Sequence, residues 1–135
     1  MIIARGDFKK FSHQATLMRL PDTHFPWVFI DSQNIYYWSN VSDIEYGALI
    51  IYRNKRILLV PDFERSRASE EAFSNVEVLS LKKYRNMLSR GIVTLLRENR
   101  YRGKKIGIDA SHFPYHMIRT LRHGNCLLYT SDAAD

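Results

Sequence analysis

The chain has 135 residues, of which 45% are hydrophobic and 25% charged, so it has the size and composition of one soluble globular domain with a buried core. It has no apolar run long enough to span a membrane, and charges interrupt the N-terminal segment MIIARGDFKKF where a signal peptide would be apolar. We therefore expect a cytoplasmic protein with no membrane partner. A single cysteine, Cys126, excludes an internal disulfide and is too few for a structural zinc site.

The net charge of +6 comes from one segment of the chain. Residues 82–105 hold nine basic residues against one acid, Glu98, which gives this window a charge of +8. We interpret the window as a solvated outer helix face, with a phosphate-binding stripe as the alternative. No nucleic-acid partner is therefore predicted.

The N-terminal part of the chain predicts a helix followed by a buried strand. Residues 7–20 place apolar side chains on one helical face, with Asp7 as N-cap, and Pro21 ends this helix. Trp27 to Ile30 is apolar on both faces, as in a central strand.

A polar pair after this strand predicts the start of a short helix. Asp31 is interpreted as the N-cap, with Ser32 next to it and the helix continuing through Trp38. Asn40 suits the left-handed C-cap that follows, and the next loop, Val41 to Glu45, is polar. A strand that runs into a helix in this way indicates an α/β fold.

The middle of the chain predicts a β-hairpin. Tyr46 to Tyr52 and Arg56 to Val60 are two β-prone runs, and the turn between them contains Asn54, at a position expected to need positive φ. Pro61 ends the second strand.

A short helix and a strand are expected next. Asp62 is predicted to cap a helix from Phe63 to Phe73. Its narrow apolar face consists of Phe63, Ala68, Ala72 and Phe73. Residues 76–81 then alternate as a short strand.

The last third predicts helix, strand and helix. Tyr84 to Asn99 is strongly amphipathic. Its apolar face consists of Tyr84, Met87, Leu88, Ile92, Leu95 and Leu96. Lys105 to Asp109 is the next strand, and Ser111 or His112 is expected to cap a final helix with Pro114 in its first turn. The spacing of His112 and His116 would suit a metal on a helix, but His112 precedes the helix and no third ligand is evident, so no metal site is predicted.

Several of these segments resemble the N-terminal domain of the creatinase/prolidase family of metallopeptidases. Asn34-Ile35-Tyr36-Tyr37 is similar to the family's ENIYYLTG segment, and residues 46–60 to its central hairpin. Val60 to Ala68 is similar to VPxLExxRA, and Lys104 to Asp109 to KKIGID/E. The resemblance covers roughly residues 27–124 and rests on the order and spacing of the motifs. It implies an α/β fold with a mixed sheet of five to six strands flanked by helices, of ribonuclease-H-like architecture.

The resemblance also implies a function for a larger parent protein. The parent would be a metal-dependent Xaa-Pro peptidase, or a relative that hydrolyses another C–N bond as creatinase does. In this family two Asp, one His and two Glu hold two divalent metals in a C-terminal domain, which is absent here. The N-terminal domain forms dimers and covers the active site. We therefore expect this chain to be inactive, without a cofactor of its own, and the parent to be a homodimer that takes proline-containing peptides.

Any contact of this chain with substrate is expected in the loop after the short helix. The candidate residues are Trp38, Ser39, Asn40 and Asp43. A plain surface loop, with Trp38 in the core, is the alternative.

Two other functions remain open. Asp31, Asp62 and Asp109 each follow an apolar strand, and a ribonuclease-H-like nuclease uses carboxylates at strand ends to hold two metals. Helix capping explains two of these three residues without any metal. A stand-alone interaction domain is the other possibility.

The C-terminal segment CLLYTSDAAD, residues 126–135, does not continue the pattern. It resembles the conceptual translation of a sequencing transposon adapter over ten codons. We therefore expect residues 1–125 to be an incomplete N-terminal domain and residues 126–135 to be a non-native tail.

Overall fold

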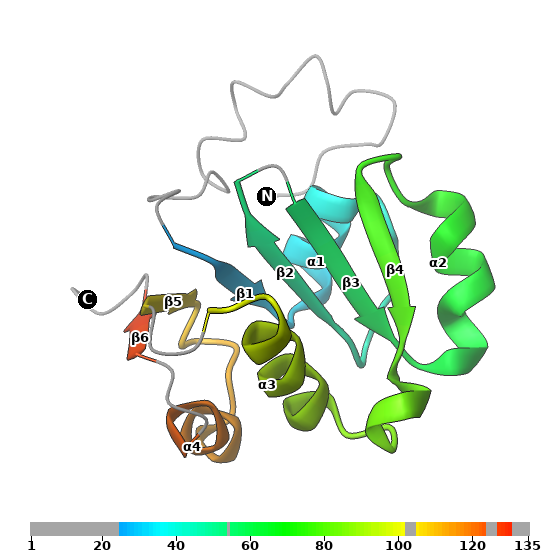
Figure 1. Cartoon of the computed structure of the whole chain (residues 1–135). Coiled ribbons are helices and arrows are strands. Elements are labelled where there is room, and N and C mark those ends of the chain that lie inside the picture. Colours follow the sequence, from blue (N-terminus) through cyan, green and yellow to red (C-terminus); the bar gives the residue numbers. More distant parts are fainter. Residues whose placement is uncertain (1–24, 54, 102–104, 124–126, 131–135) are drawn as a thin grey trace.

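The computed structural model describes residues 25–53, 55–101, 105–123 and 127–130, which form one α/β domain (Figure 1). The predicted helix over residues 7–20 lies outside the described residues. The strands in the described part of the chain are β1 (Trp27–Phe29), β2 (Ala48–Tyr52), β3 (Lys55–Val60), β4 (Val76–Ser80), β5 (Lys105–Ile108) and β6 (Leu127–Thr130). The helices are α1 (Ser32–Ser39), α2 (Arg65–Glu71), α3 (Leu88–Glu98) and α4 (Tyr115–His123), with short 3-10 helices η3 (Asp62–Glu64) and η4 (Leu81–Tyr84).

The described strands form a mixed six-stranded sheet in the order β4-β3-β2-β1-β5-β6. β2 is antiparallel to its neighbours β1 and β3, and the other pairs are parallel. The mixed sheet of five to six strands predicted from the sequence is confirmed. Because only β2 runs the other way, the carboxyl ends of the other strands meet at one edge of the sheet, where α/β folds place their ligands.

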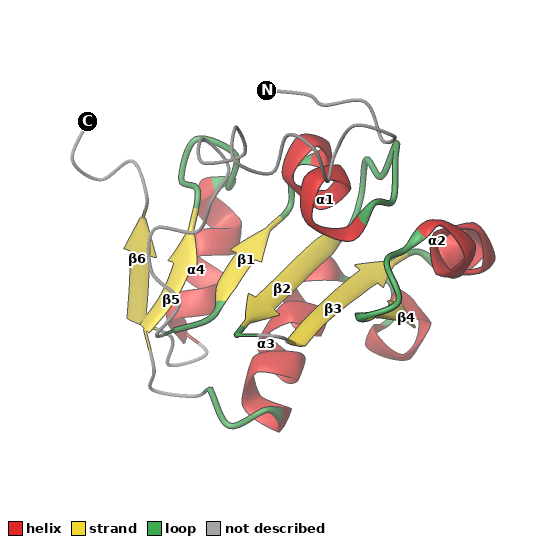
Figure 2. Cartoon of the chain, turned by 90° about the horizontal axis from the view of Figure 1, so that it is seen from above, coloured by secondary structure: helices red, strands yellow, loops and turns green. Residues whose placement is uncertain are grey.

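Helices cover both faces of the sheet (Figure 2). On one face, α3 and α4 pack against Val28, Ile50, Leu59 and other buried strand residues. On the other face, α1, the loop after it and α2 cover Trp27, Leu58 and their neighbours. The alternation of side chains along each strand thus divides the core into two layers. No helix in the described residues is long and apolar enough to cross a membrane.

The ends of α1 are capped as predicted. The Asp31 carboxylate accepts a hydrogen bond from the Asn34 backbone N–H at 3.0 Å, and Asn40 has left-handed φ and ψ of 73° and 8°. The Asn40 N–H donates to the Tyr36 carbonyl oxygen at 2.8 Å. Local capping chemistry therefore sets the length of α1.

The predicted start of α2 is wrong. Asp62 and Glu64 bound the 3-10 helix η3, α2 begins only at Arg65, and neither element has a side-chain hydrogen bond at its N-cap. This tight turn carries Phe63 outward, so that its side chain is 83% exposed. Phe63 was expected on the apolar face of the helix, and of that face only Ala68 is fully buried.

The predicted starts of the last two helices are also corrected. Arg85 and Asn86 have positive φ of 57° and 60°, so the backbone turns after η4 and α3 starts at Leu88. Met87 consequently lies outside the core, with 49% exposure, whereas Tyr84 is buried from η4.

The backbone makes a turn between β5 and α4. The Asp109 carboxylate accepts hydrogen bonds from the backbone and hydroxyl of Ser111. α4 begins after Pro114, so neither Ser111 nor His112 caps it.

The backbone of β6 pairs with β5 in parallel register. β6 belongs to the segment that we expect to be non-native. Because main-chain pairing makes little demand on side-chain identity, the origin of residues 126–135 stays a prediction.

Candidate functional site

A hollow of about 760 Å³ lies at the edge of the sheet where β3 and β4 end. Its lining residues come from the loop before β2, from Pro61 with η3, and from η4 and the turn before α3. The lining residues are Asp43, Glu45, Tyr46, Pro61, Asp62, Phe63, Glu64, Leu81 and Asn86. This edge is the position at which α/β sheets bind ligands, and the hollow is our candidate site.

The chemistry of the hollow differs from that of the chain as a whole. Carboxylates from Asp43, Glu45, Asp62 and Glu64 line it, although the chain has a net charge of +6. Its aromatic members are solvent-accessible, with Tyr46 at 47% and Phe63 at 83% exposure. Carboxylates next to aromatic faces favour a ligand that carries a positive charge and an apolar group.

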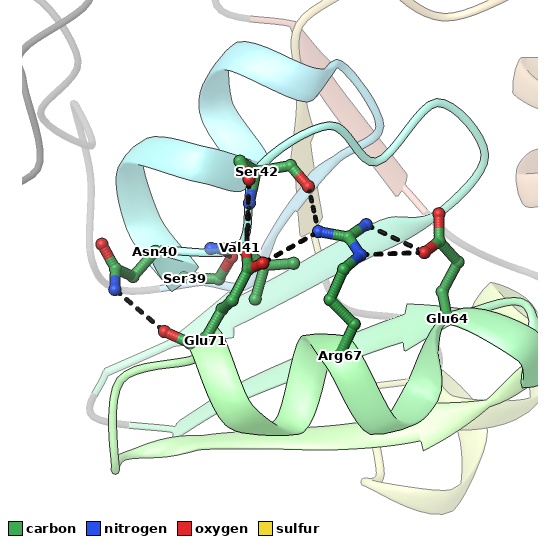
Figure 3. A network of polar contacts seen from close by, with 7 residues as sticks. All are labelled: Ser39, Asn40, Val41, Ser42, Glu64, Arg67 and Glu71. Atoms are coloured by element: carbon green, nitrogen blue, oxygen red, sulfur yellow. Dashed lines mark hydrogen bonds and ion pairs between the residues drawn. The ribbon is translucent and has the colours of Figure 1, made fainter.

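The loop that carries Asp43 is held by a polar network on α2 (Figure 3). One carboxylate oxygen of Glu71 accepts hydrogen bonds from the Ser42 N–H at 3.0 Å and from the Ser42 hydroxyl at 3.2 Å. The Asn40 side-chain amide donates to the Glu71 carbonyl oxygen at 2.8 Å. Glu71 thus holds both the end of α1 and the start of the loop.

Arg67 joins the two acidic residues of this network. Its Nη1 donates to the Ser42 carbonyl oxygen at 2.8 Å and to Glu71 Oε2 at 3.2 Å. Its Nε and Nη2 form a fork on Glu64 Oε1 at 3.1 and 2.9 Å. The hydrogen bond to Glu64 is the main cause that raises the pKa of Arg67. Because Glu64 lines the hollow, Arg67 connects the loop that starts at Ser42 to the η3 segment of the lining.

The network was missed in the sequence analysis. Glu64, Arg67 and Glu71 are spaced i, i+3 and i+7, a spacing that favours ion pairs on one helical face. That pattern could have predicted the two ion pairs of Arg67. Nothing in the sequence indicated that Ser42, 29 positions before Glu71, would complete the network.

Tyr46 fixes the other end of the loop. Its hydroxyl donates to the Asn86 carbonyl oxygen at 3.0 Å and accepts from the Leu88 N–H at 2.9 Å. The Leu88 N–H lies at the start of α3, where backbone amides have no partner within the helix. Tyr46 therefore caps α3 from a distance of 42 positions in the sequence.

Of the four predicted substrate-facing residues, the structure places only Asp43 on the hollow. Ser39 is fully buried, and its hydroxyl donates to the Ile35 carbonyl oxygen and accepts from the Val41 N–H. The Asn40 side-chain amide donates a hydrogen bond to the Glu71 carbonyl oxygen. Contact with substrate therefore stays a prediction, and Asp43 is its best-placed candidate.

Trp38 packs against an arginine instead of lining the hollow. The Arg56 guanidinium carbon lies 5.4 Å from the centre of the Trp38 ring, and Arg56 Nη1 donates to the Trp38 carbonyl oxygen at 2.6 Å. Burial lowers the pKa of Arg56. Within the described residues, Trp38 Nε1 and Arg56 Nε are both buried and lack an acceptor. We read this pair as structural, because cation–π contact and burial explain it.

The carboxylates of the nuclease hypothesis do not form a metal site. Asp31 caps α1, Asp109 accepts from Ser111, and Asp62 lies on the hollow. The described residues contain no group of three or more His, Cys, Asp and Glu side chains that could hold a metal ion. The two-metal arrangement that this hypothesis requires is not assembled from these three residues.

Comparison with known families shows which family the chain belongs to. The family model described as Creatinase/Prolidase N-terminal domain matches residues 26–133. The chain belongs to this family. The resemblance seen in the sequence motifs is thereby confirmed. Comparison with curated proteins gave no match.

Solved structures of prolidases and related peptidases share the fold. The N-terminal domain of the cytoplasmic peptidase PepQ from Mycobacterium tuberculosis H37Rv aligns with a TM-score of 0.65 at 19% identity, over 93% of this chain and 92% of that one. The prolidase from Pyrococcus furiosus aligns with a TM-score of 0.62 at 19% identity, over 94% of this chain and 32% of that one. The Xaa-Pro dipeptidase from Bacillus anthracis aligns with a TM-score of 0.65 at 12% identity, over 93% and 31%. The chain thus spans about a third of the length of these two enzymes.

Proposed function

We propose that this creatinase/prolidase N-terminal domain is the non-catalytic part of a larger, cytoplasmic, metal-dependent Xaa-Pro peptidase. The observation that carries the proposal is the family match over residues 26–133. The chain aligns with one third of a prolidase and with nearly all of a PepQ N-terminal domain. Both alignments support a non-catalytic domain within a longer enzyme.

The catalytic metals are assigned to the remainder of the parent enzyme. Two divalent metals need a cluster of carboxylate and imidazole ligands, and no such cluster exists among the described residues. We therefore derive no catalytic step from this chain.

The role proposed for the domain is to cover the active site and to form the dimer. The hollow supports the first part, because its carboxylates and aromatic rings could meet the charged amino end and apolar side chain of a peptide. Phe63 and Tyr46 support the second part, because a partner surface at this edge would remove exposed aromatic area from water.

The first experiment assays the chain itself. Purified protein is incubated with Xaa-Pro dipeptides and longer Xaa-Pro peptides in the presence of Mn²⁺ or Zn²⁺, and free amino acid is measured. We expect no release above the protein-free control. Metal-dependent release that follows the protein through purification would overturn the proposal.

The second experiment uses the full-length parent enzyme. Asp43→Asn removes one charge from the hollow and keeps the shape of the side chain, and the exposed Glu70 provides a matched control in Glu70→Gln. We expect Asp43→Asn to change KM for Xaa-Pro peptides several-fold, of the size of one charged contact, and Glu70→Gln to leave it unchanged. If both variants leave KM unchanged, Asp43 does not contact the substrate and the hollow is not part of the active-site cover.

A further inference from the structure

A second groove, separate from the hollow, lies between α3 and α4. It has a volume of about 560 Å³, and its walls come from the outer surfaces of these two helices. Both helices cover the same face of the sheet and lie side by side in Figures 1 and 2. The lining residues are Met87, Ser89, Arg90, Val93, Thr94, Arg97, Thr120 and His123.

The groove offers hydrogen-bond donors and no negative charge. Arg90 and Arg97 line its α3 side, His123 lies on its α4 side, and none of its described lining residues is acidic. Ser89, Thr94 and Thr120 also line the groove, and the Thr120 hydroxyl donates to the His116 carbonyl oxygen at 3.0 Å. In the described part of the chain, neither arginine forms an ion pair. Two guanidinium groups without carboxylate partners are free to bind an anion.

The spacing of the two arginines indicates the shape of the ligand. Arg90 and Arg97 are seven residues apart on α3, so they lie on one helical face about 10 Å apart along the axis. A single small anion would contact one of them, whereas an extended chain of anionic groups would contact both. A groove of this volume is in the range of small-ligand sites.

The scarcity of aromatic side chains in the lining favours a phosphate chain over nucleic acid. Proteins that hold single-stranded nucleic acid stack successive bases on aromatic side chains, whereas the described residues that line this groove include no Trp, Tyr or Phe and a single ring, the imidazole of His123. A ligand recognised by its phosphates alone fits this lining better.

We propose that the groove between α3 and α4 binds a linear chain of phosphate groups, such as inorganic polyphosphate or a polyphosphorylated small molecule. Arg90 and Arg97 contact phosphates at the two ends of the bound stretch. The hydroxyl of Thr94 donates to the oxygens between them, whereas the Thr120 hydroxyl already donates to the His116 carbonyl oxygen and contributes to the shape of the groove. The site is independent of the proposed peptidase function, because none of its residues lines the hollow.

The test compares two double variants of equal charge. Arg90→Gln with Arg97→Gln removes two positive charges from the groove. Arg65→Gln with Lys82→Gln removes two from exposed positions outside it. Binding of tripolyphosphate and of a longer polyphosphate is measured by calorimetry at fixed ionic strength, with orthophosphate and oligothymidylate as comparison ligands.

We expect the longer polyphosphate to bind the unaltered chain more tightly than orthophosphate does. The groove variant should lose about tenfold or more in affinity, the size expected for charge-assisted contacts, while the control variant stays within about twofold. Circular dichroism checks that both variants are folded, and backbone NMR shifts should concentrate on residues 89–97 and 120–123.

Three results would overturn the proposal. The first is no saturable binding of polyphosphate to the unaltered chain. The second is an equal loss in both double variants, which would show attraction by net charge only. The third is tighter binding of oligothymidylate than of polyphosphate with the same number of phosphates, which would assign the groove to nucleic acid.

Discussion

Gly107 of β5 lies directly against the indole ring of Trp27, its register partner on β1. A β-carbon at position 107 would lie 2.7 Å from Trp27 Cε3 and closer still to Cδ2. Trp27 is itself 1% exposed and surrounded by core residues, so the ring has no room to move away. The missing side chain of Gly107 is therefore what allows Trp27 to be buried at the centre of the sheet.

We predict that Gly107→Ala lowers the free energy of unfolding by about 2–3 kcal/mol, because the added methyl group overpacks a rigid site. The matched control is Gly91→Ala on α3, where the β-carbon would lie 3.1–3.2 Å from methyl carbons of Leu59 and Leu81 and from a ring carbon of Tyr84. There the gain in helix propensity of about 1 kcal/mol offsets the contact. Urea denaturation of both variants measures the difference, and equal losses would contradict the special role of Trp27.

The carboxylate of Glu71 gives the loop before the hollow a pH dependence. Burial raises the pKa of Glu71, but hydrogen bonds from Ser42 and Arg67 outweigh this effect and hold the pKa below its ordinary value. A carboxylate with a lowered pKa in the folded state stabilises the fold above the unfolded value of about 4.3. That contribution is lost as the pH falls through the lower, folded value.

We predict that Glu71→Gln costs about 1 kcal/mol at pH 7 and progressively less below about pH 4. Denaturant unfolding from pH 3 to pH 8 measures the difference from the unaltered chain. Glu70→Gln, at the exposed neighbouring position, is the control and should show no such trend. A difference that stays constant over the whole pH range would mean that the charge of Glu71 does not contribute.

Removal of the Tyr46 hydroxyl group is expected to lower the stability of the fold. Tyr46→Phe removes the bonds to Asn86 and Leu88 and keeps the ring. We expect a cost of about 1 kcal/mol, since the Leu88 amide at the start of α3 loses its acceptor. Tyr115→Phe, at a position that is 69% exposed, should change stability by less than about 0.5 kcal/mol. Thermal unfolding of both variants checks the comparison, and an equal effect would contradict the proposed capping.

The C-terminal segment gives a prediction about the gene. We predict that the natural reading frame continues differently after residue 125 and does not encode CLLYTSDAAD. Sequencing of independent clones across codon 126 measures this directly. Recovery of the same ten codons in each clone would show that residues 126–135, with β6, are native.

Features that depend on neighbours in the chain were predictable from the sequence. The Asp31 cap and the left-handed Asn40 involve residues a few positions apart, and the hairpin of β2 and β3 pairs residues at most eleven positions apart. The amphipathic pattern of α3 likewise predicted its buried face from Leu88 to Leu96. Such features follow from backbone capping and side-chain periodicity, which act over one or two turns.

The candidate site depended on the tertiary structure. Ser39 looked available for substrate, but packing of α1 on the sheet buries it completely. Phe63 looked like a core residue, but the 3-10 helix after Pro61 turns it into the solvent. The sequence by itself determined the family through the order of its motifs, and the mixed sheet through that resemblance. It determined most of the helices and strands through hydrophobic periodicity. Only the tertiary structure decided that Asp43, Tyr46 and Phe63 share one hollow, because Phe63 belongs to a different element from the other two and its place beside them depends on how the chain packs.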